Sequence, residues 1–131
     1  MKSNKSLVEA LGKFLDVLDN IHTSWQYSTG YLAEYYEKLN PARHDTENHI
    51  SNELIPPAGQ TELQYAAKLL KLVEEACYLC HLTRWTSPDD EPNNKGEKKI
   101  LKDMLERPPA IHNELRESWM HLTHVEMLLA K

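Results

Sequence analysis

The chain has 131 residues, which is enough for one hydrophobic core and too few for two, so we expect a single domain over residues 1–131. Its composition, 40% apolar and 27% charged, is typical of a globular protein and excludes a disordered or membrane-embedded chain. The net charge of −5 makes the protein acidic and argues against nucleic acid as its partner, because phosphate binding requires clustered Lys and Arg.

The start of the sequence shows no targeting signal. Its basic residues are followed by Glu9, Lys13 and Asp16, which interrupt what would have to be an apolar stretch. No apolar run reaches the length of a membrane span. We therefore expect a cytoplasmic protein without membrane contact, in which Cys77 and Cys80 are reduced thiols.

A long amphipathic helix is the main feature predicted for the first third of the chain. Ten positions between residues 7 and 39 are spaced alternately four and three residues apart, and this spacing places them on one helical stripe. Nine of the ten positions are apolar or aromatic: Leu7, Leu11, Phe14, Leu18, Ile21, Trp25, Leu32, Tyr35 and Leu39, with Ser28 as the exception.

The length of this helix raises a question of fit. A continuous helix over residues 6–40 measures roughly 50 Å, whereas a compact chain of 131 residues has a diameter of roughly 36 Å. The helix must therefore either break at Ser28-Thr29-Gly30 or project past its own domain, and the pattern favours a continuous, projecting helix. Its far end would then be exposed and available to another protein, through Trp25, Tyr31, Leu32, Tyr35, Tyr36 and Leu39.

A long connector is predicted next. Pro41 should end the first helix, and residues 41–60 form a polar connector that leaves room for a short helix near residues 46–54. Thr61 and Gln64 then have the spacing of a capping box. They predict the start of a central, widely apolar helix that ends near Trp85.

Two further helices are expected after the loop 87–96. A short one covers residues 97–106 and stops at Pro108-Pro109, and the last begins at Pro109. The apolar stripe of the last helix consists of Ile111, Leu115, Trp119, Leu122, Val125 and Leu129. The predicted fold is therefore all-α: a four-main-helix bundle with a long N-terminal helix, a long 41–60 connector and a short third helix.

A structural zinc site is one hypothesis for the polar residues of this bundle. Cys77 and Cys80 lie one helical turn apart, and so do His121 and His124. If the helices that carry them run parallel, the two pairs lie at similar depth and supply two thiolates and two imidazoles, a full tetrahedral set. The alternative is that the thiols are small buried apolar residues and the imidazoles are ordinary helix residues. Apart from this zinc, no cofactor is expected.

The stretch from Leu101 to His112 resembles the part of HEPN domains that carries their Arg-x4-6-His motif. HEPN domains are small helical bundles, and many are dimeric, metal-independent ribonucleases of toxin and phage-defence systems. The resemblance implies that Arg107 steadies the RNA phosphate and that His112 acts in cleavage. The sequence departs from the family pattern at Pro108 and Glu114, where a polar residue and a Tyr are usual.

The sequence favours a binding protein over an enzyme. The predicted long helix offers an aromatic and apolar surface, and none of the nucleotide-binding or hydrolase motifs occurs. We therefore expect a protein that binds another protein in a regulatory or inhibitory role, or that forms a homodimer. The HEPN-like ribonuclease and the zinc-binding bundle are the alternatives.

Overall fold

The fold was taken from a computed structural model, which describes residues 4–27, 32–83 and 95–129. For most of 95–106 and a few other helical positions, it describes the backbone alone. Within these ranges all regular secondary structure is helical, as predicted, and consists of α1 (Lys5–Gln26), α2 (Leu32–Glu53), α3 (Glu62–Thr83) and α4 (Lys95–Leu129). None of the described helices is long and apolar enough to cross a lipid bilayer.

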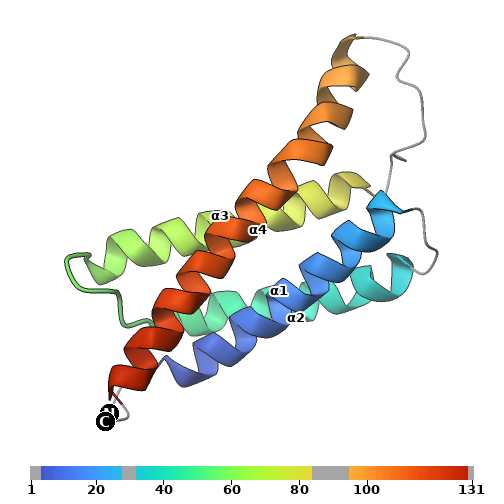
Figure 1. The fold of residues 1–131 in the computed structure, drawn as a ribbon. Coiled ribbons are helices and arrows are strands. Elements are labelled where there is room, and N and C mark those ends of the chain that lie inside the picture. The colour runs from blue at the N-terminus through green and yellow to red at the C-terminus, as the bar shows by residue number, and fades with distance from the viewer. Residues whose placement is uncertain (1–3, 28–31, 84–94, 130–131) are drawn as a thin grey trace.

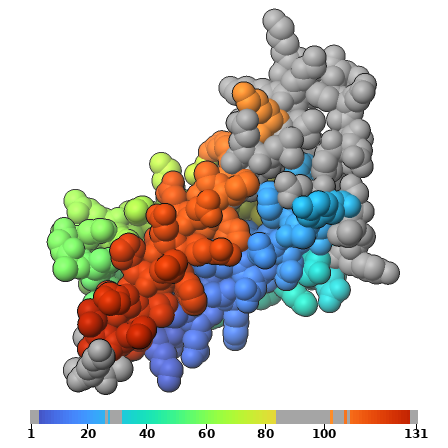
Figure 2. All heavy atoms as spheres, in the orientation of Figure 1, coloured from blue at the N-terminus to red at the C-terminus, as the bar shows by residue number. Residues whose placement is uncertain are grey.

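The four helices form an antiparallel bundle (Figure 1). α1 packs on α2 and α4, and α3 packs on α2 and α4, whereas α2 and α4 lie diagonally across the bundle. The Thr46 hydroxyl donates to the Ala10 carbonyl and so joins α2 to α1. Figure 2 shows the C-terminal part of α4 covering the seam between α1 and α3. Each helix therefore runs opposite to both of its neighbours.

The apolar stripe predicted for α1 is the centre of the core. Leu7, Leu11, Phe14, Leu18, Ile21 and Trp25 are all buried. Facing them are the apolar side chains of the other three helices and of the loop after α2, among them Leu39, Ile50, Leu54, Leu69, Val73, Leu115 and Leu122. This agreement follows from the helical period, because residues three and four apart must share one face.

The first long helix is broken, and the prediction of a continuous helix was wrong. α1 ends at Gln26 and α2 begins at Leu32, so the break falls around the Ser28-Thr29-Gly30 stretch, whose residues lie outside the described ranges. α2 returns antiparallel to α1 and places Leu39 in the core of its own chain. Covering this apolar surface internally removes the need for the first helix to project.

The proline positions also differ from expectation. α2 continues through Pro41 to Glu53, so the expected 41–60 connector shrinks to residues 54–61. Pro41 and Glu37, whose carbonyl loses its helical partner at this proline, are both exposed, and water can satisfy that carbonyl. α4 likewise continues through Pro108 and Pro109 as one helix, so there is no separate short third helix (Figure 1).

The start of α3 agrees with the capping prediction. The backbone N–H of Gln64 donates to the Thr61 hydroxyl at 3.2 Å, which is the forward half of a capping box. At the start of α1 the N-cap residue is Asn4, whose side chain makes no capping hydrogen bond. This side chain is fully buried and bonds to another part of the chain.

Asn4 joins three ends of the bundle. Its side-chain amide donates to the Ile55 carbonyl at 2.9 Å and its carbonyl accepts from the Ile55 N–H at 2.8 Å. Its backbone N–H donates to the Glu126 carboxylate near the end of α4, at 2.9 Å. One residue therefore ties the start of α1 to the α2–α3 loop and to α4.

Candidate functional site

The outer face of α4 carries an exposed apolar stripe. Met120, Met127 and Leu128 are 59%, 60% and 57% exposed, although they lie on the helix that also buries Leu115 and Leu122. Positions 120, 127 and 128 are separated by seven and eight residues, so they recur on one face after two turns. Exposed His124 lies between them on the same face.

Charged and polar side chains surround this stripe. Arg116, Glu117 and His121 are exposed on the turns that precede or flank it. An apolar centre with a polar rim is the usual anatomy of a protein–protein interface. The sequence contains this signal, because Met120 and Met127 lie opposite the apolar stripe of the last helix, but only the buried stripe was predicted.

α4 is also much longer than its neighbours. It contains 35 residues, whereas α1, α2 and α3 contain 22 each. These lengths correspond to about 52 Å and about 33 Å. Figure 1 shows the N-terminal part of α4 extending past the ends of α1 and α3. The helix that outruns the bundle is thus the last one, and not the first as the sequence had suggested.

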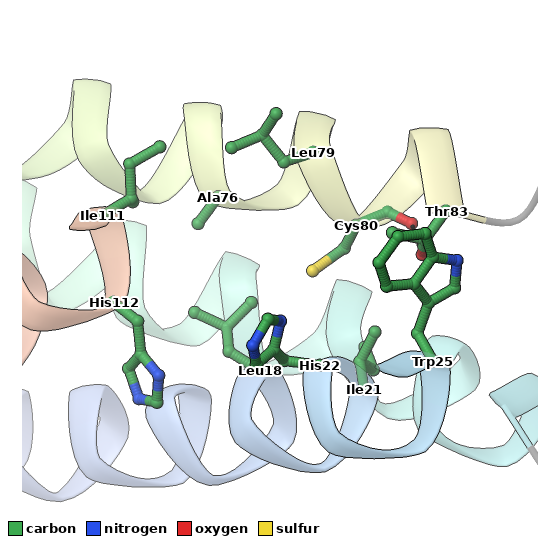
Figure 3. Close-up of a pocket in the computed structure, with 10 residues that line it drawn as sticks. All are labelled: Leu18, Ile21, His22, Trp25, Ala76, Leu79, Cys80, Thr83, Ile111 and His112. Carbon is green, nitrogen blue, oxygen red and sulfur yellow. Dashed lines mark hydrogen bonds between the residues drawn. The ribbon is translucent and has the colours of Figure 1, made fainter. Parts of the chain in front are cut away.

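A second feature is an apolar groove between α1, α3 and α4 (Figure 3). α1 supplies Leu18, Ile21, His22 and Trp25, α3 supplies Ala76, Leu79, Cys80 and Thr83, and α4 supplies Ile111 and His112. The space enclosed by this groove has a volume of about 30 Å³. That volume is room for about two water molecules and is far below the roughly 150 Å³ of a cavity that accepts benzene.

Two imidazoles line this groove. His22 and His112 are half-buried and come from α1 and α4, and Figure 3 shows both rings beside the α1 ribbon, opposite the side chains of α3. Burial lowers the pKa of His22, and Asp19 opposes this. Burial also lowers the pKa of His112, with Arg116 and His22 adding to the effect and Asp19 opposing it. Both rings are therefore held in their neutral form.

The aromatic surface predicted on the first long helix is largely internal. Trp25, Tyr36 and Leu39 are buried, Leu32 and Tyr35 are half-buried against the core, and Tyr31 lies outside the described residues. The Tyr36 hydroxyl pairs with the Thr83 hydroxyl of α3, which itself donates to the Cys80 carbonyl. The expectation that this surface is exposed was wrong, because it depended on the continuous helix.

The four residues of the zinc hypothesis are not brought together. Cys77 and Cys80 are buried near the C-terminal end of α3, whereas His121 lies in a groove beside Tyr65 near the start of that helix. The antiparallel course of α3 and α4 causes this separation. Across the described part of the chain, no three His, Cys, Asp or Glu side chains are grouped closely enough to hold a metal ion.

Burial holds the two thiols in their protonated form. Burial raises the pKa of Cys77 to about 12, although nearby Arg43 favours the thiolate. Burial, with a contribution from Cys77, raises the pKa of Cys80 to about 12 as well. A thiol with such a pKa is almost entirely protonated at neutral pH and is a poor nucleophile or metal ligand.

Arg107 and His112, the pair suggested by the HEPN resemblance, lie on different sides of α4. Arg107 forms an ion pair with Glu75 of α3, in a groove lined also by Lys68 and Lys71. His112 lines the apolar groove against α1. Five residues of helix separate them by about 140°, so one ligand on the helix surface does not meet both.

Comparison with known proteins gives no relative from which a function could be transferred. No protein-family model matches the chain, and it matches neither a curated protein nor a solved structure. The function is therefore inferred from the chain's own residues and geometry.

Proposed function

We propose that this protein acts by binding another polypeptide through the outer face of α4, and that the partner is a second copy of itself. The observation that carries the proposal is the exposed apolar stripe of Met120, Met127 and Leu128. Long, flexible Met side chains adapt to a partner surface, and removing their area from water favours association. Because the protein carries a net charge of −5, two copies repel each other weakly. We therefore expect the dimer to form at high protein concentration.

The stripe suits antiparallel pairing of two α4 helices. A two-fold axis beside His124 would place Met120 of each copy against Met127 of the other. The same contact would then occur twice in the dimer and would cover both methionines of each copy. Because an antiparallel pair also opposes the two helix dipoles, this arrangement is favoured over a parallel one. His124 would then face its own symmetry mate at the centre.

Sedimentation velocity from micromolar to millimolar protein tests the association. We expect the weight-average mass to rise with concentration toward that of a dimer. Met120→Gln and Met127→Gln should each reduce the association, because a polar amide replaces a buried thioether. Leu63→Gln is the matched control, because Leu63 is 82% exposed on α3 and lies outside the stripe.

Cross-linking tests the direction of pairing. Met120→Cys and Met127→Cys proteins, mixed and oxidised, should form a disulfide between the two variants, whereas parallel pairing would link each variant to itself. The buried native thiols should not compete. A wild-type protein that stays monomeric at every concentration, or stripe variants that associate as strongly as wild type, would refute the proposal.

A further inference from the structure

The groove between α1, α3 and α4 contains an arrangement of charge and burial that the proposed self-association does not use. His22 and His112 face it from two different helices, and the rest of its wall is apolar apart from Cys80 and Thr83. The Nε2 atom of His112 is buried and has no hydrogen-bond partner. A neutral imidazole tolerates this position at moderate cost, but an imidazolium needs water or an acceptor there.

The charged groups around the two rings favour the neutral state on balance. Asp19 of α1 attracts a proton to either ring, whereas Arg116 of α4 and the second imidazole repel one from His112. From α3 the groove receives Cys80, which stays an uncharged thiol. One exposed carboxylate therefore faces two imidazoles and a guanidinium, so it can balance only part of the charge once both rings are protonated.

The two ends of the α1–α4 contact are held differently. Away from the groove, the Trp119 indole donates to the Val8 carbonyl at 2.9 Å, and the Asn4 backbone N–H donates to Glu126 at 2.9 Å. At the groove, the contact consists of apolar side chains and the two imidazoles. A loss of attraction at the groove can therefore separate the helices there while the other end stays attached.

We propose that the His22–His112 pair is an acid-sensitive latch, which releases the middle of α4 from α1 when both rings are protonated and so opens the apolar groove to water. Protonation places two like charges beside Arg116 at the rim of an apolar groove, and hydrating them requires α4 to move outward. This proposal concerns the inner face of α4 and does not depend on self-association through its outer face.

The direction of the pH effect follows from linkage. Folding lowers the affinity of both rings for protons, so the closed state is favoured while they are neutral. That stabilisation is fully present above the pKa of an unfolded His, about 6.5, and is lost progressively as the pH falls below it. Each pKa unit of depression in each ring corresponds to about a tenfold change in the opening equilibrium.

Amide hydrogen exchange between about pH 7.5 and pH 5.5 tests the latch, after correction for intrinsic exchange rates. We expect the amide protection of residues 107–118 in α4 to fall as the pH is lowered. The loss should be at most about tenfold for each pKa unit of depression in each ring. Residues 119–126 and the middle of α2 should keep their protection. In the His22→Gln, His112→Gln double variant, protection of 107–118 should not change with pH in this range. His44→Gln is the matched control, because it removes an exposed imidazole of α2, outside the groove, and should leave the wild-type response intact.

Three results would overturn the latch: no loss of protection in 107–118, a loss spread evenly over all four helices, or the same loss in the double variant. If the double variant does not fold, NMR titration of the imidazole resonances in the wild type decides the question. His22 and His112 should then titrate below the pKa of an unfolded His, about 6.5, and titration at or above that pH would also overturn the latch.

Discussion

Substitution of Asn4 should destabilise the protein, although this residue lies close to the start of the sequence. The side chain is fully buried and makes two hydrogen bonds to the backbone of Ile55, one as donor and one as acceptor. Asn4→Ala removes both and leaves the N–H and carbonyl of Ile55 without these partners. The bond from the Asn4 backbone to Glu126 does not involve the side chain and should persist.

The expected cost follows from these contacts. Each lost hydrogen bond is worth about 1 kcal/mol, and a partly buried backbone group left unsatisfied adds about 1 kcal/mol more. The sum is a loss of about 2–4 kcal/mol in the free energy of unfolding. For a chain of this size it lowers Tm by about 10 °C.

Asn4→Asp separates the donor from the acceptor. The carboxylate can still accept from the Ile55 N–H, but it cannot donate to the carbonyl and it lies near Glu126. We expect it to cost at least as much as Asn4→Ala at neutral pH, and less in acid, where the protonated carboxyl group can donate.

Urea unfolding followed by circular dichroism measures these changes, and Asn113→Ala on the exposed face of α4 is the control, with an expected change below about 0.5 kcal/mol. A loss smaller than about 1 kcal/mol for Asn4→Ala would show that the Asn4–Ile55 pair does not hold the loop to α1.

Three further substitutions or treatments have defined outcomes. Pro41→Ala should increase the free energy of unfolding by about 1–3 kcal/mol and so raise the urea midpoint, because it restores a helical hydrogen bond inside α2. An unchanged midpoint would contradict this prediction. Gly12→Ala places its Cβ 3.3 Å from the Trp119 indole nitrogen, so it should be nearly neutral in the wild type but stabilise a Trp119→Phe background by about 1 kcal/mol; equal effects in both backgrounds would argue against the contact. Iodoacetamide at pH 7.5 should leave Cys77 and Cys80 unlabelled until urea unfolds the protein, as mass spectrometry can show; rapid labelling of the native protein would contradict their burial.

The sequence was most informative where a local period determines the outcome. The spacing of Leu7, Leu11 and Phe14 is enough to place them on one face, and all three are buried. The bond from the Gln64 N–H to Thr61 is equally local, because donor and acceptor are three residues apart. Predictions of this kind need no knowledge of how the helices meet.

The positions of Pro41, Pro108 and Pro109 show the limit of such local rules. A helical proline breaks one hydrogen bond, and the cost can be offset when the freed carbonyl is hydrated and tertiary packing favours a continuous helix. Exposed Pro41 fits this account, but the packing that decides it is made by α1 and α3, far away in the sequence.

The candidate sites depended on helix order and direction, which the sequence does not encode locally. Cys77 and His121 would have met if their helices ran parallel, but α3 and α4 are antiparallel neighbours. Trp25 and Leu39 would have been exposed on one long helix, but the return of α2 buries them. A single misplaced break therefore displaced both the predicted interface and the predicted ligand set.

The length of α4 gives small motions a large reach. Trp119 anchors the helix to α1, and 24 residues separate it from Lys95 at the start of α4. A lever arm of this length measures about 36 Å, so a tilt of only about 5° about the anchor would carry its tip by about 3 Å. A label near Lys95 would thus act as a pointer that magnifies changes at the groove into displacements measurable by distance spectroscopy.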